Sequence, residues 1–136
     1  MADVTTLYRV TPPTLPQDWP QALEWITPAC KRIALYGPTY VYEKVKSGEW
    51  QLFLVRSGER CCAAVLAEIA VFPLQTVLRI PICTGREYQN WLHHLKTIEK
   101  FAKDRGATIS GLIAREGWAR LLPDYNLTHV IIEKRL

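Results

Sequence analysis

One amphipathic stretch, residues 84–107, constrains the fold of this chain more than any other part of the sequence. It reads TGREYQNWLHHLKTIEKFAKDRGA, and its apolar residues recur at the spacing of one helical face. Thr84 and Glu87 match a capping box, in which each side chain binds an exposed backbone donor. Gly106 is typical of a helix end. We therefore expect one helix over residues 84–107.

Two apolar, β-rich runs flank this helix, residues 76–83 before it and residues 108–114 after it. A strand, a helix and a strand in this order predict a crossover connection and a parallel or splayed pair of strands. Pro81 lies inside the first run and has no backbone N–H, which favours a β-bulge or a sheet edge at that position.

The rest of the chain supplies further strands and helices around this unit. Residues 11–20 are proline-rich and are expected to form a loop. The other expected elements are a strand at 7–10, a helix from 22 to the Gly37-Pro38 break, a helix at 39–46, strands at 50–55 and 61–71, a short helix at 116–122 and a last strand at 127–136. This order predicts an α+β sandwich, a single domain over residues 1–136. It has a central mixed, mostly antiparallel sheet with helices on both faces.

Composition limits the possible functions. With 136 residues and 49% hydrophobic residues, the chain can build one globular core. No apolar run approaches the length of a membrane span, and Asp3 with the prolines after it disfavours a signal peptide. We expect a protein that is not secreted.

The cysteines and histidines do not match a metal site. Cys30, Cys61, Cys62 and Cys83 lack zinc-site spacing and lie in apolar runs, so reduced structural thiols are expected. His93 and His94 are adjacent on the expected helix and cannot chelate as a stacked pair, while His129 is isolated in the sequence. The sequence predicts no metal centre.

The net charge of +4 is modest. Four basic residues of the long helix form one candidate basic face: Lys96, Lys100, Lys103 and Arg105. Glu99 and Asp104 interrupt this face, which favours an ordinary solvated surface over a nucleic-acid interface. Nucleic-acid contact remains a weaker alternative.

The order of elements, with the segments EKFAKDRGA and GWARLLPDYNL, resembles the GNAT (Gcn-type N-acetyltransferase) superfamily. The resemblance implies an α/β sandwich and, in an active member, the use of acetyl-coenzyme A. In that family, glycines in the turn before the long helix let backbone amides approach the pyrophosphate of coenzyme A. Six positions fall over this turn: Arg86, Glu87, Tyr88, Gln89, Asn90 and Trp91. All but Glu87 would hold the cofactor in an active member.

This turn departs from the family pattern. The glycine positions carry bulky or polar residues, and Glu87 places a carboxylate where a phosphate would bind. A family-type base would be Glu68, the one carboxylate in the middle strands. The position of the family's tyrosine acid is occupied by Leu122, so Tyr125 is the alternative acid.

Two functional hypotheses follow. The first is a non-catalytic GNAT-fold binding or structural protein without a cofactor, because the segments GEWQLFLV and GWARLLPDYNLTHVIIEKRL resemble small GNAT-like structural proteins of tailed bacteriophages. Its partners would be other virion proteins or further copies of itself, in a virion or the host cytoplasm. The alternative is an acetyl-CoA-dependent N-acetyltransferase that uses Glu68, Tyr125 and the turn at Arg86.

Overall fold

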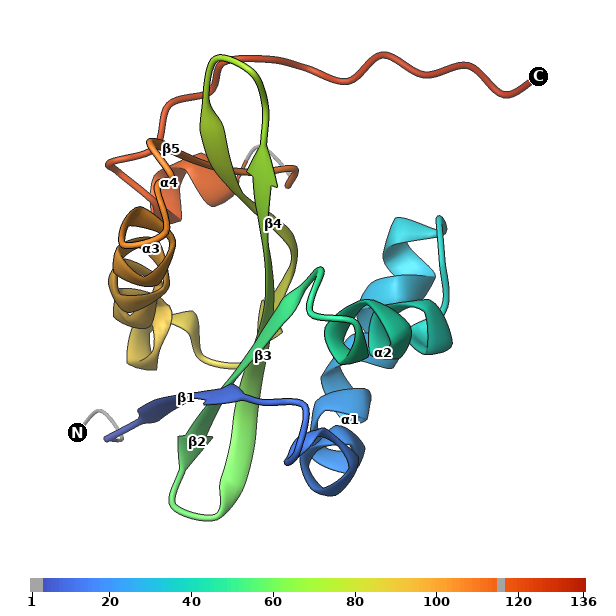
Figure 1. Ribbon diagram of the computed structural model, residues 1–136, viewed down its shortest axis with the longest axis vertical. Helices are drawn as coiled ribbons and strands as arrows, with labels where there is room; N and C mark the ends of the chain where they lie inside the picture. Colours follow the sequence, from blue (N-terminus) through green and yellow to red (C-terminus); the bar gives the residue numbers. More distant parts are fainter. Residues whose placement is uncertain (1–3, 115–116) are drawn as a thin grey trace.

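The computed structural model describes residues 4–114 and 117–136. A five-stranded sheet with the spatial order β1-β2-β3-β4-β5 forms its centre (Figure 1). The strands are β1 Thr6–Val10, β2 Gln51–Ser57, β3 Arg60–Val71, β4 Thr76–Gly85 and β5 Ile109–Leu112. The helices are α1 Leu15–Ile33, α2 Pro38–Lys46, α3 Leu95–Lys103 and α4 Trp118–Leu121, with two short 3-10 turns, η1 Tyr88–Asn90 and η2 Leu92–His94.

The sheet is mixed and mostly antiparallel, as predicted. The strands β1 to β4 pair antiparallel with their neighbours, and β5 pairs parallel with β4 from Val77↔Ile109 to Ile80↔Leu112. The connection from β4 to β5 runs through α3, so the expected crossover is confirmed. The fold class is therefore the α+β sandwich expected from the sequence.

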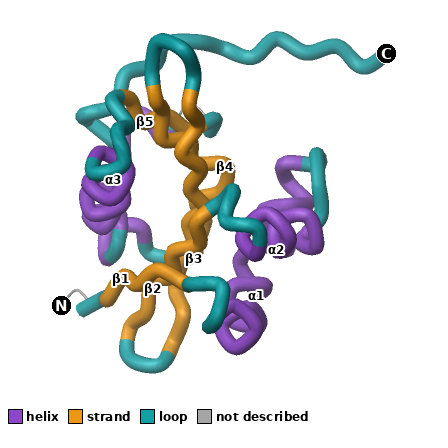
Figure 2. The backbone as a smooth tube through the Cα atoms, in the orientation of Figure 1, coloured by secondary structure: helices purple, strands orange, loops and turns teal. Residues whose placement is uncertain are grey.

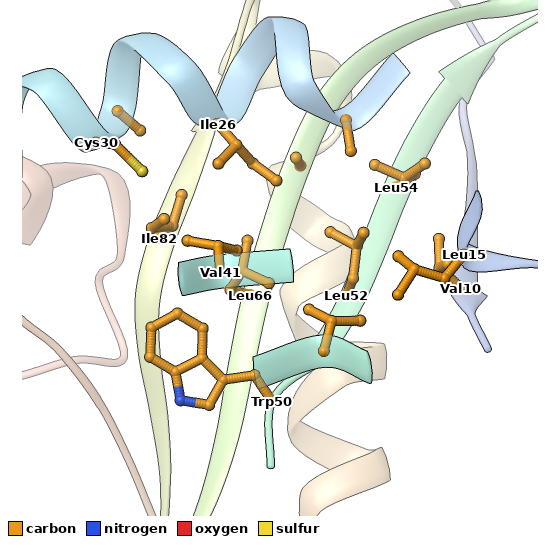
Figure 3. Close-up of a cluster of buried hydrophobic side chains, with 14 residues drawn as sticks. Val10, Leu15, Ile26, Cys30, Val41, Trp50, Leu52, Leu54, Leu66 and Ile82 are labelled. Carbon is orange, nitrogen blue, oxygen red and sulfur yellow. The ribbon is translucent and has the colours of Figure 1, made fainter. Parts of the chain in front are cut away.

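Both faces of the sheet are covered by helices. The helices α1 and α2 lie on one face, and α3 and α4 lie on the other (Figures 1 and 2). We call the two buried layers the α1–α2 core and the α3 core. The α1–α2 core includes Ile26, Val41, Trp50, Leu52, Leu54 and Leu66 (Figure 3). The α3 core includes Phe53, Val55, Val65, Leu78, Trp91 and Ile98.

The predicted loop over residues 11–20 is only partly correct, because α1 already begins at Leu15. Pro16 lies in the first turn of α1, where proline removes no needed backbone donor. Pro20 and Pro28 are inside the helix. The buried face formed by Leu15, Ala22 and Ile26 holds the helix together across these positions.

The predicted long helix over residues 84–107 is wrong in its first half. Thr84 belongs to β4, and α3 begins only at Leu95. Glu87 has a left-handed backbone with φ of 53°, which is incompatible with a helical first turn. The capping box of Thr84 and Glu87 therefore does not form. The residues of η1 and η2 connect the strand to the helix.

The C-terminal end also differs from the prediction. The expected strand at residues 127–136 is absent, and this segment leaves the domain as an extended, unpaired stretch (Figure 1). The expected helix at 116–122 is present as α4, which begins at Trp118; Glu116 lies outside the described residues.

Candidate functional site

The sheet opens between β4 and β5 at a bulge beside Pro81. The register between β3 and β4 shifts between Leu66↔Ile82 and Glu68↔Arg79, so two residues of β4, Ile80 and Pro81, face one residue of β3. This confirms the bulge predicted from the proline. Pairing with β5 ends at the same place, at Ile80↔Leu112.

Beyond the bulge, β4 has pairing only on one side. Residues 82–85 continue to pair with β3, and no described strand lies on their other side. Backbone groups along such an edge can hydrogen-bond an extended ligand in the manner of an added strand. The opening is therefore the place where this fold can accept a long, flexible molecule.

The turn after β4 is held by its own hydrogen bonds. The amide of Asn90 donates to the Glu87 carbonyl at 2.9 Å, and that of Trp91 donates to the Tyr88 carbonyl at 3.1 Å. The Trp91 side chain is 1% exposed, and its Nε1–H donates to the Arg86 carbonyl at 2.7 Å. Two of the amides that a phosphate would need are thus already bonded within the turn.

Thr5 ties this turn to the strand at the other edge of the sheet. Its hydroxyl donates to the Asn90 carbonyl at 2.8 Å and lies 2.9 Å from His94 Nε2. Tyr88 packs on Trp91 and Trp118, with ring centroids 5.5 and 5.2 Å apart, so it belongs to the α3 core. Gln89 is exposed.

Arg86 lines a small cavity of about 70 Å³ on the α1 side of the turn. Its guanidinium lies over the Trp25 ring at 5.5 Å, and its backbone N–H donates to the Cys62 carbonyl at 3.0 Å. The cavity is lined by Thr5, Trp25, Ser57, Arg60, Cys62, Arg86, Glu87, Asn90 and Trp91. Two arginines make it attractive to a small anion, and Glu87 reduces this attraction.

Tyr125 lies in a groove of about 470 Å³ beside β5, on the α3 side of the sheet. Its hydroxyl donates to Glu99 Oε2 at 2.7 Å and lies 2.5 Å from Ser110 Oγ. Because the one phenol proton is given to Glu99, Ser110 is the donor in the second bond. Burial first, and then the bond to Glu99, raises the pKa of Tyr125 well above its ordinary value. The phenol therefore keeps its proton at neutral pH, as a general acid requires.

Glu68 lies on the opposite face of the sheet from Tyr125. Its Oε2 accepts a hydrogen bond from Trp50 Nε1 at 3.2 Å, and Trp50 belongs to the α1–α2 core. Two further aromatic rings, Tyr36 and Tyr40, pack against Trp50 at 5.7 and 6.0 Å. The two candidate catalytic residues are thus separated by the sheet.

The remaining candidates give no second site. Among residues 4–114 and 117–136, no cluster of three or more metal-ligating side chains occurs. In the same part of the chain, no helix has the length and apolar character needed to cross a bilayer. On the basic face of α3, Lys100 pairs with Asp104 at 3.1 Å, and Arg105 lies over the Phe101 ring at 3.5 Å. Two of the four expected cations, Lys100 and Arg105, are therefore already in contact with neighbouring residues of the same segment.

We predict that His94 makes the fold less stable in mild acid. Burial first, and then the neighbouring His93, lowers the pKa of His94 below 6.5. In the unfolded chain the same imidazole protonates near pH 6.5, so the unfolded state binds more protons as the pH falls. The unfolding free energy, measured by urea titration, should decrease from pH 7.5 to pH 5.5.

Replacing this histidine isolates its contribution. His94→Gln should flatten the pH dependence, whereas His129→Gln, at an exposed position, should leave it unchanged. Equal slopes for the wild type and His94→Gln would contradict the assignment.

Several residues of the site were not found from the sequence. Ser110 and Glu99 hold Tyr125, but they lie 15 and 26 residues from it, and no local spacing connects them. Arg60 lines the cavity at Arg86 from the end of β3. Of the features of this site, only the bulge could be predicted from the sequence, because Pro81 lies within an apolar run.

No protein-family model matches this sequence, and a search of curated proteins finds no match. Solved structures do match. One is an aminoglycoside acetyltransferase from an uncultured soil metagenomic sample, in complex with trehalose, at a TM-score of 0.72, 9% identity and coverage of 97% of this chain and 96% of that one. The chain has the GNAT fold.

Two other matches support the same conclusion about the fold. A ribosomal-protein-alanine N-acetyltransferase from Brucella melitensis biovar Abortus 2308 gives a TM-score of 0.71 and 9% identity, with 97% of this chain and 100% of that one covered. A GCN5-related N-acetyltransferase from Ralstonia eutropha JMP134 gives 0.70 and 14% identity, with 96% and 98% covered. At such low identity the likeness concerns the GNAT fold and not the activity.

Proposed function

We propose that this GNAT-fold chain is an acetyltransferase that takes its acetyl group from acetyl-coenzyme A and transfers it to an amine. The observation that carries the proposal is the opening of the sheet beyond Ile80, where β4 has a free edge over residues 81–85. The similar solved structures include an aminoglycoside acetyltransferase and a ribosomal-protein-alanine N-acetyltransferase, which supports the same reaction class.

The residues present fit the cofactor in part. The free edge of β4 suits the pantetheine arm, which carries two amides, and Arg86 with Arg60 suits a phosphate. The turn itself fits less well, because the amides of Asn90 and Trp91 are bonded within it. Binding would thus depend on the arm and on the arginine side chains more than on a backbone cradle.

Acetyl-coenzyme A supplies an activated thioester, whose carbon–sulfur bond breaks as the new carbon–nitrogen bond forms. The departing thiolate needs a proton, and Tyr125 holds one at neutral pH. The attacking amine must lose a proton. Glu68 is the candidate base, and because it lies across the sheet from Tyr125, the amine would have to approach the thioester from the α1–α2 face. The aromatic rings of Tyr36 and Tyr40 near Trp50 are suited to an incoming ammonium group.

The first test is a thermal melt with and without acetyl-coenzyme A. A ligand at a hundred times its Kd stabilises by about 2.7 kcal/mol, which raises the Tm of a domain of this size by several degrees. Arg86→Ala should reduce the shift, and Arg32→Ala, at an exposed position of α1, should not. Absence of any shift with the wild type would overturn the proposal.

The second test concerns Tyr125. Tyr125→Phe should keep the thermal shift with acetyl-coenzyme A. The rate at which free thiol is released in the presence of a panel of amines should fall about 10²-fold or more. An unchanged rate would remove Tyr125 from the reaction. A parallel Glu68→Gln variant should also lower the rate and keep the thermal shift if Glu68 is the base, and an unchanged rate would remove Glu68 from the reaction.

The bonded turn favours a second candidate, a non-catalytic binding protein on the same fold. Thr5, Trp91 and the Glu87 carbonyl close the turn from within, so it needs no phosphate to be complete. Its partners would be other proteins or further copies of the chain. None of the three solved structures named above is described as a virion protein, so the phage hypothesis gains no support from them. A wild-type protein whose Tm does not change with acetyl-coenzyme A would favour this non-catalytic function.

A further inference from the structure

The α1–α2 face of the sheet carries two opposite charges side by side that do not pair with each other. Glu68 of β3 and Arg79 of β4 are direct partners in the antiparallel register. Glu68 binds Trp50 of the α1–α2 core, and Arg79 lies between Leu78 and Ile80 of the α3 core, so both charged side chains leave the sheet on the α1–α2 side. Opposite charges in such positions normally attract each other. In the described part of the chain, neither belongs to an ion pair.

Each of the two charges contacts an aromatic ring instead. Glu68 Oε2 accepts the Trp50 Nε1–H at 3.2 Å, and a carboxylate can accept several more hydrogen bonds. The Arg79 guanidinium lies over the Phe72 ring at 5.2 Å, and its N–H groups donate to none of the described residues. An acceptor and a set of donors are therefore both available to a ligand at adjacent positions.

The surroundings of the pair are open and partly apolar. The end of the sheet that carries the β3–β4 turn extends beyond α1 and α2 (Figures 1 and 2). Arg79 pairs with Gly111 of β5, and a Cβ at Gly111 would meet nothing within 4 Å. Ile109, two residues earlier on the same face, is 47% exposed, and Phe72 is 45% exposed. A small ligand thus has room beside Arg79 and apolar side chains to contact.

We propose that Glu68 and Arg79 bind the two charges of a free α-amino acid with an apolar side chain, which is then the acetyl acceptor; this rests on the acetyltransferase function proposed above. The ammonium lies at Glu68 and the carboxylate at the Arg79 guanidinium, whose paired donors match it. The two groups of an α-amino acid are separated by one carbon atom. Directly opposite residues on neighbouring strands, with Cβ atoms about 4.5–5.5 Å apart, can hold both.

This position also places the amine beside the opening of the sheet. The register shift next to Glu68 is the bulge at Pro81, beyond which β4 loses its pairing with β5. The carbon–nitrogen bond forms as the carbon–sulfur bond breaks. Of the two protons that the ammonium loses, one remains on the thiol product and the other leaves through Glu68 to solvent.

The charges at this position disfavour other amines. A polycationic acceptor would meet the positive charge of Arg79, and a simple amine would leave that charge without a partner. The neighbouring cation Lys44 is bound by Glu49 at 2.6 Å, whereas Arg79 has no such carboxylate. The site therefore selects for a carboxylate next to the amine.

The experiment compares L-phenylalanine with phenethylamine, which has the same ring and primary amine but no carboxylate. With acetyl-coenzyme A, thiol release should give a kcat/KM that is about tenfold to a hundredfold higher for the amino acid. Equal values, or a preference for phenethylamine, would overturn this inference and leave the acetyltransferase function standing, because thiol would still be released.

A calorimetric titration without the cofactor tests the same site independently of transfer. L-phenylalanine should bind more tightly than phenethylamine by a similar factor. A protein that binds neither compound, or both equally, would overturn the inference whatever the result with acetyl-coenzyme A.

Two matched variants locate the carboxylate. Arg79→Gln should lower the preference for L-phenylalanine to near one in both measurements. Arg9 is also an exposed strand arginine over a phenylalanine ring, with its guanidinium 5.1 Å from Phe101, but it lies on the α3 side. Arg9→Gln should therefore keep the preference. A preference that survives Arg79→Gln would refute the role of Arg79.

Discussion

Replacing Trp91 by alanine should remove about 3–5 kcal/mol of unfolding free energy, the largest single effect expected in this chain. The indole is 1% exposed, fills the α3 core and donates its N–H to the Arg86 carbonyl at 2.7 Å. Alanine leaves a cavity and an unpaired carbonyl, and both destabilise the fold. Because domains of this size have about 5–15 kcal/mol in total, urea unfolding should shift to much lower denaturant.

A second substitution should have a smaller effect. Trp91→Phe keeps a six-membered aromatic ring in the core but loses the five-membered ring of the indole together with its N–H, so it should cost about 1–3 kcal/mol. A Trp91→Ala protein as stable as the wild type would contradict the packing described for the turn.

Gly85→Ala is expected to have the second-largest effect. A Cβ at Gly85 would lie 2.5 Å from the Ala63 Cβ and 2.6 Å from the Cys62 carbonyl oxygen. Neither neighbour is the end of a flexible side chain, so β3 and β4 must move apart where the chain leaves the sheet. Such overpacking costs about 1–3 kcal/mol, which thermal or urea unfolding will measure.

Gly111 supplies the matched control for this substitution. It also lies in a strand, in β5, but a Cβ there meets nothing within 4 Å. Gly111→Ala should therefore be neutral or slightly stabilising, because it reduces the freedom of the unfolded chain. Equal losses at both positions would show that the close approach at Gly85 is not the cause.

The middle of the fold was predictable from the sequence. The strands β2, β3 and β4 are runs of buried residues such as Leu52 to Val55, with Ser57 near the turn between the first two. Pro81 predicted the bulge because a proline cannot donate to a strand ladder. Both signals depend only on residues that are neighbours in the sequence. They can therefore be recognised without knowing which distant segments come into contact.

The start of the helix could not be predicted for the opposite reason. Thr84 and Glu87 carry the spacing of a capping box, but Gly85 allows β4 to continue along β3 as far as the Cys62 carbonyl. Pairing with a distant strand therefore outweighs a local helix signal. The same limit applies to Tyr125, whose partners Ser110 and Glu99 are brought to it only by folding.

The final strand was expected at residues 127–136, which include three consecutive β-branched residues. Its composition is right for a strand, but a strand forms only when a partner is available on an edge. Residues 127–136 leave the sheet before any pairing, so composition predicted the tendency and not the outcome.

The coverage of both sheet faces has a consequence for dissecting the molecule. Leu52 and Leu54 belong to the α1–α2 core, and Phe53 and Val55 belong to the α3 core. The strand β2 therefore contributes to both cores. A fragment that ends before α3 would expose Phe53 and Val55 to water. A fragment that lacks α1 would expose Leu52 and Leu54. We expect neither half to remain in solution when expressed alone, and the whole chain to melt in a single cooperative transition.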